Sequence, residues 1–361
     1  MSAHLKSDSI AIVLPRGTSF GPSRATSIDL CVHDFVRHSR YADRLTIHST
    51  AIENSFPGFD LRGDHGGAGG QIGKAVRIAR RIRNEGASLT VVHQHLPSAF
   101  VLSKLLAHPV LLHAHNFQKA MRPSIHRWMR RWRYSGLAGI IFVSEECRSD
   151  FQKKWPDLKI PSFVVHNRLD LSLWAPAPQK SRQILVVARA APEKGVLDAA
   201  LAIQRALPGL PGWTSLFILS EVERHPAYHE QIREIASASN GAITIVTNQT
   251  HQAVKEATEA SEIALVLSKW AEPFGRTAIE AHAGGAALIS SGRGGLHEVS
   301  ADAALYVDPQ DCDQVAATIL KLATQDALRH TLADRGRARV SKYFEIRQVS
   351  ATLDDVYQLY L

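Results

Sequence analysis

The stretch 170–195, DLSLWAPAPQKSRQILVVARAAPEKG, indicates how the chain is divided. It begins with a polar, proline-rich segment (170–183) whose composition is typical of a linker. An apolar run (183–188), a polar loop and the expected start of a helix follow. A buried strand that leads directly into a helix is the first half of a βαβ unit. The stretch therefore predicts that one α/β domain ends near residue 170 and that a second begins after it.

Short apolar runs recur on both sides of this stretch. Six precede it and five belong to it or follow it, at 10–14, 45–49, 89–93, 109–115, 139–143, 163–166, 183–188, 214–219, 242–246, 263–267 and 286–290. Amphipathic segments lie between most of them, a pattern typical of parallel sheets covered by helices on both faces. We expect an α/β protein with two doubly wound, Rossmann-like domains, 1–170 and 171–344. Ligands of such sheets bind at the carboxyl ends of the strands, which are expected to face a shared cleft.

The bulk composition is that of a soluble globular protein. The chain has 361 residues, of which 45% are hydrophobic and 21% are charged, enough for two ordinary domains. The first residues are polar and no long uncharged apolar run occurs, which predicts neither a signal peptide nor a transmembrane span. Three scattered cysteines, Cys31, Cys147 and Cys312, favour a reducing cytoplasm over a disulfide scaffold or a cysteine-rich metal site.

The net charge of +8 is unevenly distributed. Residues 1–170 contain 24 Lys and Arg against 13 Asp and Glu, whereas residues 171–361 contain 18 against 21. Two helical patterns in the basic half, 72–86 and 124–134, combine arginines with an apolar stripe. Such helices can bind an anionic membrane surface, or can cover a sheet and leave their arginines in solvent. No nucleic-acid-binding signature is present, so nucleic acid is not an expected partner.

Two cations occupy the loop at 188–195. Arg189 and Lys194 follow a predicted strand and precede a predicted helix, so both are expected at the carboxyl edge of the second sheet. Fixed cations beside the free N–H groups of a helix N-terminus are suited to binding a diphosphate. The alternative is ordinary solvated charge in a surface loop.

Two glutamates eight residues apart mark the motif EPFGRTAIE. Pro273 and Gly275 are unfavourable in a helix interior, so we expect Glu272 on a loop and a helix that starts near Gly275. Glu280 then lies on the second turn of that helix. The loop, the helix N-terminus and both carboxylates can face one ligand.

Three other motifs are interpreted by their context. The Gly-rich turn SSGRGGLHE (290–298) follows the next strand, where backbone can approach a ligand closely. AGGQIGKA (68–75) lacks the first glycine and the final Ser or Thr of a phosphate loop. DCD (311–313) has an Asp-x-Asp metal-binding pattern but stands at an expected helix start, where Asp is a common cap.

Histidines end two predicted strands of the first domain, as HQH and HAH. The period of a strand places His93 with His95, and His113 with His115, on common faces. Four histidines could bind zinc, but no cysteine or evident set of carboxylate ligands accompanies them, so no metal site is expected. A histidine that contacts substrate at the edge of the cleft is the preferred interpretation.

Together these motifs resemble a retaining glycosyltransferase of family 4 with the GT-B fold. The resemblance covers most of the chain. VVHNRLDLSLWAP resembles the interdomain segment, ILVVARAAPEKGV the stretch that binds the donor diphosphate, and EPFGRTAIEA the E-x7-E signature. The sequence departs from the family in ILSEVER (218–224), which has no Gly-rich turn after its strand.

The resemblance implies roles for the charged residues in the second domain. Arg189 and Lys194 would bind the donor diphosphate. Glu272 would contact the hydroxyls of the donor sugar, and Glu280 the ribose.

The resemblance also implies contacts elsewhere. The backbone N–H groups of Phe274 and Gly275 would reach the sugar and phosphate region, and Gly17 and Gly21 would lie in the N-terminal Gly-rich loop. LLHAHNF resembles the segment whose histidine reaches the reacting sugar, here His115. The implied catalytic residues are His115, Glu272, Arg189 and Lys194.

The family resemblance assigns the acceptor to domain 1–170 and the nucleotide-sugar donor to domain 171–344, with a last helix (345–361) that crosses back. Cations and helix N–H groups can stabilise a departing diphosphate without a metal, and no protein nucleophile is evident. The expected reaction is transfer of a hexose from a UDP- or GDP-sugar to a saccharide or lipid-linked acceptor in bacterial surface polysaccharide or lipopolysaccharide synthesis. The expected location is the cytoplasm, with contact to the inner face of the plasma membrane as a hypothesis. Alternatives are a nucleotide-sugar epimerase or hydrolase, and a non-catalytic nucleotide-sugar binder.

Overall fold

The computed structural model describes all residues except 1–7, 16–19, 22–25, 51–53, 65–69 and 120–123. The chain divides into two compact units. Unit 1 comprises Met1–Asn167 and Ile346–Leu361, and unit 2 comprises Arg168–Glu345. No helix within the described ranges is both long and apolar enough to cross a bilayer.

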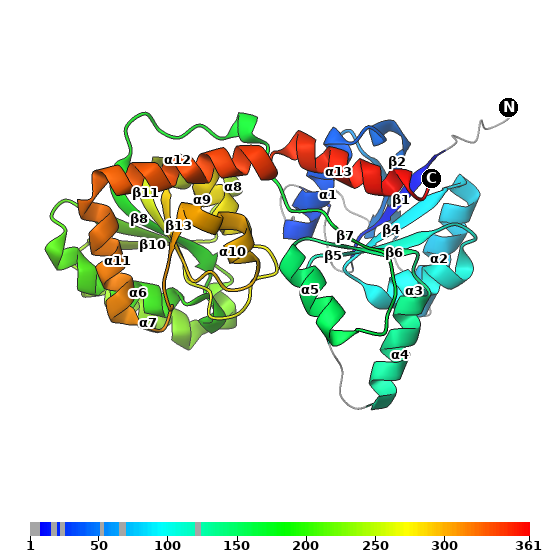
Figure 1. Cartoon of the computed structure of the whole chain (residues 1–361), viewed down its shortest axis with the longest axis horizontal. Coiled ribbons are helices and arrows are strands. Elements are labelled where there is room, and N and C mark those ends of the chain that lie inside the picture. Colours follow the sequence, from blue (N-terminus) through cyan, green and yellow to red (C-terminus); the bar gives the residue numbers. More distant parts are fainter. Residues whose placement is uncertain (1–7, 16–19, 22–25, 51–53, 65–69, 120–123) are drawn as a thin grey trace. The chain divides into compact units, whose positions relative to one another are not determined.

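Unit 1 contains a seven-stranded parallel sheet in the order β3-β2-β1-β4-β5-β6-β7 (Figure 1). The strands are β1 (Ile10–Val13), β2 (Leu45–Thr50), β3 (Asp60–Asp64), β4 (Leu89–His93), β5 (Val110–Ala114), β6 (Gly139–Phe142) and β7 (Ser162–Val164). The helices are α1 (Ser27–His38), α2 (Gly70–Glu85), α3 (Leu96–Leu105), α4 (Ser124–Ser135), α5 (Glu145–Lys154) and α13 (Ile346–Gln358). The strand order reverses between β1 and β4, which places the connecting helices on both faces of the sheet.

Coverage on both faces explains why the central strands of unit 1 are continuous apolar runs. Every residue of β1, β4, β5 and β6 is buried. A strand that is buried on one face alternates apolar and polar residues, whereas a strand buried on both faces does not. The apolar runs of the sequence therefore predict these strands correctly.

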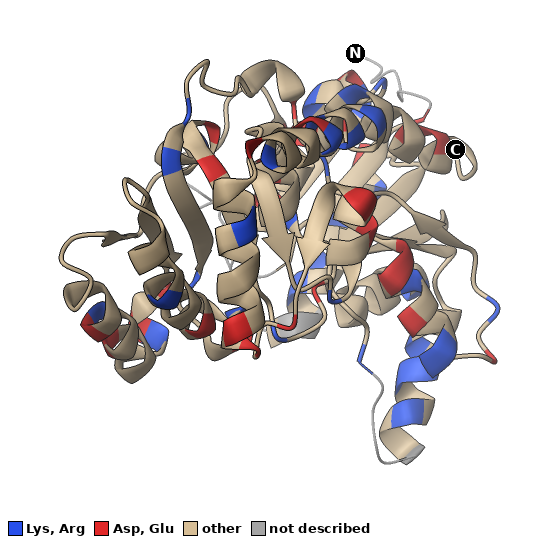
Figure 2. Cartoon of the chain, turned by 60° about the vertical axis from the view of Figure 1, so that its left-hand side comes forward, with Lys and Arg blue, Asp and Glu red and all other residues tan. Residues whose placement is uncertain are grey.

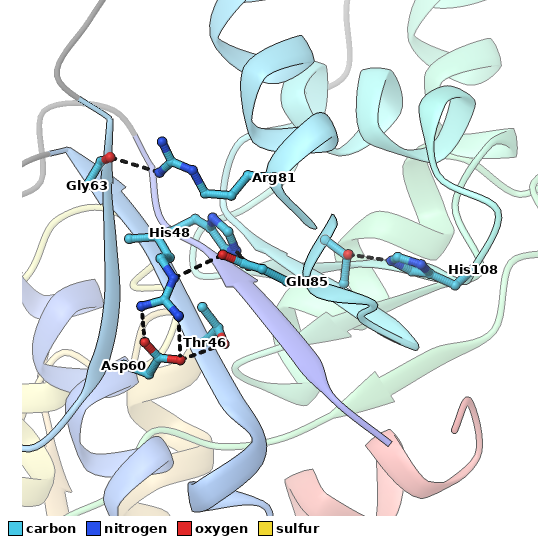
Figure 3. Close-up of polar contacts among 9 residues, drawn as sticks. Thr46, His48, Asp60, Gly63, Arg81, Glu85 and His108 are labelled. Atoms are coloured by element: carbon cyan, nitrogen blue, oxygen red, sulfur yellow. Dashed lines mark hydrogen bonds and ion pairs between the residues drawn. The ribbon is translucent and has the colours of Figure 1, made fainter. Parts of the chain in front are cut away.

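Strand β3, of sequence DLRGD, is not predicted because it is a charged edge strand with no apolar run. Arg62 donates hydrogen bonds to Asp60 and, from Nε at 3.0 Å, to Glu85 at the end of α2 (Figure 3). Nε2 of the buried His48 lies 3.3 Å from the other oxygen of Glu85. Burial raises the pKa of Glu85, but the hydrogen bond from His48 and the pairing with Arg62 outweigh it, so the pKa is lower than usual. Polar contacts thus hold this edge of the sheet.

Helix α13 packs against α1 in unit 1. Leu353 and Val356 of α13 join the apolar core of that unit. The buried carboxylate of Asp354 accepts hydrogen bonds from Ser39 Oγ at 2.5 Å and from the Arg40 backbone N–H at 2.7 Å. The C-terminal segment is therefore an integral part of unit 1.

Unit 2 contains a six-stranded parallel sheet in the order β10-β9-β8-β11-β12-β13. The strands are β8 (Ser181–Arg189), β9 (Thr214–Ser220), β10 (Ile243–Thr247), β11 (Ser261–Val266), β12 (Ala287–Ser290) and β13 (Ala304–Tyr306). The helices are α6 (Val196–Ala206), α7 (Pro226–Ser237), α8 (His251–Ala260), α9 (Arg276–Ala283), α10 (Gly295–Ser300), α11 (Cys312–Thr324) and α12 (Asp326–Tyr343). The 3₁₀ helices of both units are η1 (Ala42–Arg44), η2 (Leu171–Leu173), η3 (Pro192–Lys194), η4 (Leu207–Gly209), η5 (Val222–Arg224) and η6 (Ala301–Ala303).

The predicted α/β class with two doubly wound sheets is confirmed. The predicted strand runs coincide with strands in both units, but the edge strands β3 and β13 are missed. The motif DCD is structural, as predicted, since Asp311 caps α11 and accepts the Gln314 backbone N–H at 2.9 Å.

Candidate functional site

A cavity of about 380 Å³ lies at the carboxyl ends of β8 and β11 in unit 2. The strand order of this sheet reverses between these two strands, and ligands of doubly wound sheets bind at that point. The four charged residues predicted for this domain all line it: Arg189, Lys194, Glu272 and Glu280. The fold therefore brings together side chains that are up to 91 positions apart in the sequence.

The loop after β8 places both predicted cations. Arg189 is the last residue of β8 and Lys194 the last of η3. Gly195 follows with φ of 65°, and a Cβ there would lie 2.1 Å from the Leu267 carbonyl oxygen. Only glycine allows this loop to pass so close to the end of β11.

The N-terminus of α6 adjoins this loop, but part of it is already bonded. The backbone N–H of Leu197 donates to the Tyr228 hydroxyl at 2.9 Å. Burial, the largest influence, raises the pKa of Tyr228, so the hydroxyl is neutral at physiological pH. A phosphate at this helix N-terminus would use the other N–H groups or displace the tyrosine. No motif in the sequence predicts this role for Tyr228.

Arg189 is held between two carboxylates. Its guanidinium lies 3.2 Å from Glu193 and 3.6 Å from Glu221. Glu221 occupies the turn after β9 with φ of 55°, a left-handed conformation that favours glycine. The departure from the family pattern at 218–224 therefore places a carboxylate beside the predicted diphosphate-binding cation.

Glu272 is the centre of a hydrogen-bond network that uses one of its two oxygens. Oε1 accepts from Lys194 Nζ at 2.5 Å, from Trp270 Nε1 at 3.1 Å and from the Ser268 hydroxyl. No described residue donates to Oε2. Glu272 is only 8% exposed but lines the cavity, so its position is fixed while one oxygen remains available to a ligand.

The Gly-rich turn at 290–298 supports the loop of Glu272. Glu272 and Gly294 form a parallel β-bridge, and the Gly295 N–H donates to the Glu272 carbonyl at 2.7 Å. A Cβ on Gly294, which has φ of 65°, would lie 2.4 Å from that carbonyl oxygen. The turn therefore packs its backbone against the glutamate loop, and its approach to a ligand stays a prediction.

Glu280 lies on the second turn of α9, as predicted. Its Oε1 accepts from Arg276 Nε at 2.9 Å and lies 3.6 Å from His251 Nε2. Burial raises the pKa of Glu280, but the hydrogen bond from His251 and the charge of Arg276 outweigh it, and the pKa is below the usual range. Glu280 is therefore an ionised acceptor at neutral pH. His251, which also lines the cavity, was not predicted.

The remaining predicted donor contacts lie outside the lining of this cavity. Gly275 caps α9 with φ of 109°, and Phe274 packs edge-on against Phe344 at 5.6 Å between ring centroids. The roles of their backbone N–H groups remain predictions. Gly17 lies outside the described residues. Gly21 belongs to unit 1 and is buried, and a Cβ there would lie 2.0 Å from the Asn54 carbonyl oxygen.

His115 belongs to unit 1, where it forms a buried cluster with His93 and His113. The rings of His113 and His115 stack at 4.5 Å with 15° between their planes, and His93 Nδ1 lies 2.9 Å from His115 Nε2. The expected pairing of His93 with His95 is wrong. Gln94 adopts φ of 62°, which turns His95 away to cap α3.

Among the described residues, these three histidines are the group whose ligand atoms lie close enough together to hold a metal ion. These atoms lie within 4.8 Å of one another. An ion bound to several imidazoles lies close to the plane of each ring, which near-parallel stacked rings do not allow. The geometry therefore favours a hydrogen-bonded stack over three ligands of one ion.

Comparisons with known proteins show similarity over this part of the chain. Residues 175–339, which contain all four charged residues, match the family model for glycosyl transferases group 1. The chain is 26% identical over 312 residues to a glycogen synthase of Mycobacterium tuberculosis, covering 78% of this chain and 72% of the relative. It is 25% identical over 284 residues to a phosphatidyl-myo-inositol mannosyltransferase of Mycolicibacterium smegmatis, covering 74% and 70%.

Solved structures share the fold over nearly the whole chain. A glycosyltransferase from Rickettsia africae superposes with a TM-score of 0.81 at 16% identity, covering 98% of this chain and 99% of the other. HepE of Anabaena, in complex with UDP and glucose, superposes with a TM-score of 0.77 at 16% identity, covering 96% and 99%. Residues 175–339 therefore match the group 1 glycosyl transferases, and nearly the whole chain shares the GT-B fold of solved glycosyltransferase structures.

Proposed function

We propose that the chain is a retaining, metal-independent hexosyltransferase of family 4 that uses a UDP- or GDP-sugar. The observation that carries this proposal is the cavity at the strand-order reversal of unit 2, lined by two cations and two carboxylates. Cations suit the diphosphate of such a donor, and carboxylates suit the hydroxyls of its sugars. Unit 2 is then the donor domain and unit 1 the acceptor domain.

Arg189 and Lys194 act on the leaving group in this proposal. Breaking the bond between the anomeric carbon and the phosphate leaves negative charge on the diphosphate. Two cations held in place by Glu193, Glu221 and Glu272 can stabilise that charge without a metal. The departing phosphate takes the proton of the acceptor hydroxyl, so the mechanism needs no protein nucleophile.

Glu272 binds the donor sugar through the oxygen that no described residue uses. Its other oxygen accepts three hydrogen bonds, which orient the carboxylate. Glu280 binds the ribose in the same manner, since Arg276 and His251 both approach its Oε1. In this proposal His115 of unit 1 contacts the reacting sugar.

The proposed acceptor is a saccharide or a lipid-linked saccharide of a bacterial surface polysaccharide or lipopolysaccharide. One relative is named for a phosphatidylinositol acceptor, which supports a lipid-linked substrate here. A cytoplasmic enzyme with such an acceptor works at the inner face of the plasma membrane.

Of the two basic helices, α4 supports membrane contact better than α2. In α2, Arg77 pairs with Asp64 at 3.1 Å and Arg81 donates to the Gly63 carbonyl at 2.8 Å, so these arginines hold strand β3. In α4, Ile125 and Trp128 are each more than 60% exposed. Basic residues also lie along α4, as Figure 2 shows in blue. Anionic vesicles should bind the protein, neutral vesicles should not, and salt should weaken the binding.

A thermal-shift screen with UDP, GDP, ADP and their common sugars, with and without EDTA, tests the donor site. A ligand at 100 times its dissociation constant stabilises a protein by about 2.7 kcal/mol. We expect a shift that is selective for one nucleotide and unchanged by EDTA. A shift that requires a divalent ion would contradict metal independence, and no shift with any nucleotide would contradict the donor site.

Product analysis with the selected donor then tests the reaction. A new glycosidic bond with retained configuration at the anomeric carbon supports the proposal. An altered or hydrolysed donor without transfer indicates an epimerase or a hydrolase. Donor binding without turnover indicates a binder, in which the carboxylates around Arg189 fit a site that no longer reacts.

A further inference from the structure

A second cavity, of about 370 Å³, lies within unit 1 between helices α2, α3 and α4. Its volume falls within the range of about 300–1,000 Å³ that is usual for small-molecule sites. Most of the lining is apolar and comes from Ala75, Pro97, Phe100, Val101, Met129 and Trp132. The group-transfer chemistry proposed above uses none of these residues.

Trp132 and Phe100 form one wall of this cavity. Their rings are 4.3 Å apart at the centroids, and the indole remains 49% exposed. Met129, one turn earlier on α4, is 38% exposed. Exposed large apolar side chains that surround a hollow are costly in water unless a ligand covers them. The occupant of this wall is therefore expected to be apolar.

Two polar residues, Arg133 and His95, also line the cavity. Arg133 is half-buried in the lining and makes no ion pair with any described residue. His95 accepts the Ser98 backbone N–H at its Nδ1, and its ring lines the cavity. An arginine and an imidazole beside an apolar wall fit an anionic group that is joined to an apolar chain.

The position of His95 links this cavity to the ligand-binding edge of the sheet. His95 follows β4, and the strand order of unit 1 reverses between β1 and β4. Ligands of a doubly wound sheet bind outside that reversal. An anionic head near His95 would lie at this edge while its apolar chain occupied the space between α3 and α4.

We propose that this cavity binds the apolar chain of a lipid-linked saccharide acceptor, with the phosphate that joins the chain to the saccharide near Arg133 and His95. The inference rests on the proposed transferase function and specifies its acceptor class. The proposal also links the cavity to the membrane contact proposed for α4. A lipid chain that leaves a bilayer would pass the exposed apolar side chains of α4, among them Ile125 and Trp128, before it enters the cavity.

Calorimetric titration of the whole protein with alkyl phosphates of four to ten carbons, below their micelle concentrations, tests the site. Burial of each methylene contributes about 0.8 kcal/mol, so affinity should rise about fourfold per carbon until the chain fills the cavity. Inorganic phosphate should bind far more weakly than the decyl ester. Affinity that does not depend on chain length would overturn the proposal.

The chain offers matched control residues on α4. Trp132 lines the cavity, whereas Trp128, one turn away and parallel to it, does not. We expect Trp132→Ala to weaken decyl phosphate binding at least tenfold and Trp128→Ala to change it less than twofold. Equal effects of the two substitutions would indicate a surface contact and overturn the cavity site.

Arg133→Gln and Arg131→Gln separate the phosphate contact from general charge. Arg133 lines the cavity, whereas Arg131 is exposed and lies 3.7 Å from Asp157. Only the first substitution should weaken the phosphate ester, and neither should affect decanol. Val101→Phe fills the space without removing a wall and should also prevent binding. Equal weakening by both arginine substitutions would overturn the assignment of the phosphate to Arg133.

These titrations need no sugar donor and no turnover, so they are independent of the donor assay. Normal nucleotide binding without chain-dependent binding of alkyl phosphates would refute the cavity proposal alone. Chain-dependent binding in a protein that binds no nucleotide would refute the transferase proposal and leave a lipid phosphate site.

Discussion

The sheets of the two units share one strand pattern but carry different chemistry at their carboxyl edges. In both, the order reverses between the first and fourth strands of the unit. In unit 2 the reversal is lined by Lys, Arg and Glu side chains, whereas in unit 1 it adjoins stacked imidazoles and an apolar cavity. The fold therefore determines where a ligand binds, and the loop residues determine which ligand it is.

The largest effect is expected at the charged edge. Glu272→Ala should lower kcat of transfer by about 10²–10³-fold, because a fixed contact to the reacting sugar is lost. Nucleotide affinity should remain or increase, since Lys194 loses its carboxylate partner. Steady-state kinetics and calorimetry measure the two effects. Glu230→Ala, at an exposed position on α7, is the control, and a Glu272 variant with near-native kcat would contradict the site.

The comparison of the two units also concerns protein stability. Within the described part of the chain, unit 2 contains a single buried histidine, His282, which lies outside any histidine cluster. His282 donates to or accepts from Ser300 at 3.0 Å, and burial, followed by the charge of Arg339, lowers its pKa to about 4. Below pH 6.5 the unfolded chain binds a proton that the folded chain does not. Stability is therefore complete above pH 6.5 and falls by about 3 kcal/mol as the pH decreases through 4.

Urea unfolding between pH 7 and pH 4 measures this loss against His282→Gln, which cannot be protonated. The difference in unfolding free energy between wild type and variant should change by about 3 kcal/mol over that range. A constant difference would show that His282 does not couple folding to protonation.

The third expectation concerns the cations of unit 2. Lys194→Ala should weaken UDP or GDP binding about 10–100-fold, since a charge-assisted contact contributes about 1.5–3 kcal/mol. Lys321→Ala, at an exposed position on α11, should have no effect. Equal affinities of the Lys194 variant and wild type for the diphosphate would indicate that this lysine only anchors Glu272.

The smallest expected effect is a gain in diphosphate affinity, not a loss. Glu221→Gly removes a carboxylate 3.6 Å from Arg189 and suits a backbone with φ of 55°. We expect diphosphate affinity to rise about threefold, the gain from a weak, partly exposed ion pair. Glu221→Ala should give the same gain in affinity but be less stable, because alanine disfavours that conformation. Weaker binding in both variants would show that Glu221 helps to hold the ligand.

The buried strands were predictable because each is a continuous apolar run, and the loops between strand and helix were predictable from their Pro, Gly and charged residues. The sequence did not reveal β3, because this edge strand has no apolar run and is stabilised by the hydrogen bonds of Arg62 to Asp60 and Glu85. It also placed His95 with His93, because strand periodicity does not anticipate the left-handed Gln94.

The ligand-facing charges of unit 2 were predictable, but their partners were not. Arg189, Lys194, Glu272 and Glu280 occur in short motifs and converge on one cavity. Glu221, Tyr228 and His251 approach the same region from other loops, with no motif of their own. Contacts between distant loops depend on tertiary structure, which a local pattern does not encode.

The pairing of each cation in unit 2 has a consequence for how fast the donor arrives. Arg189 and Lys194 are neutralised locally by Glu193, Glu221 and Glu272, so the site projects little net field into solvent. Long-range attraction, which accelerates encounter at strongly charged sites and weakens as salt is added, is then small. The association rate of the nucleotide sugar should hardly change with ionic strength, and selection of the donor should depend on the contacts that form after encounter.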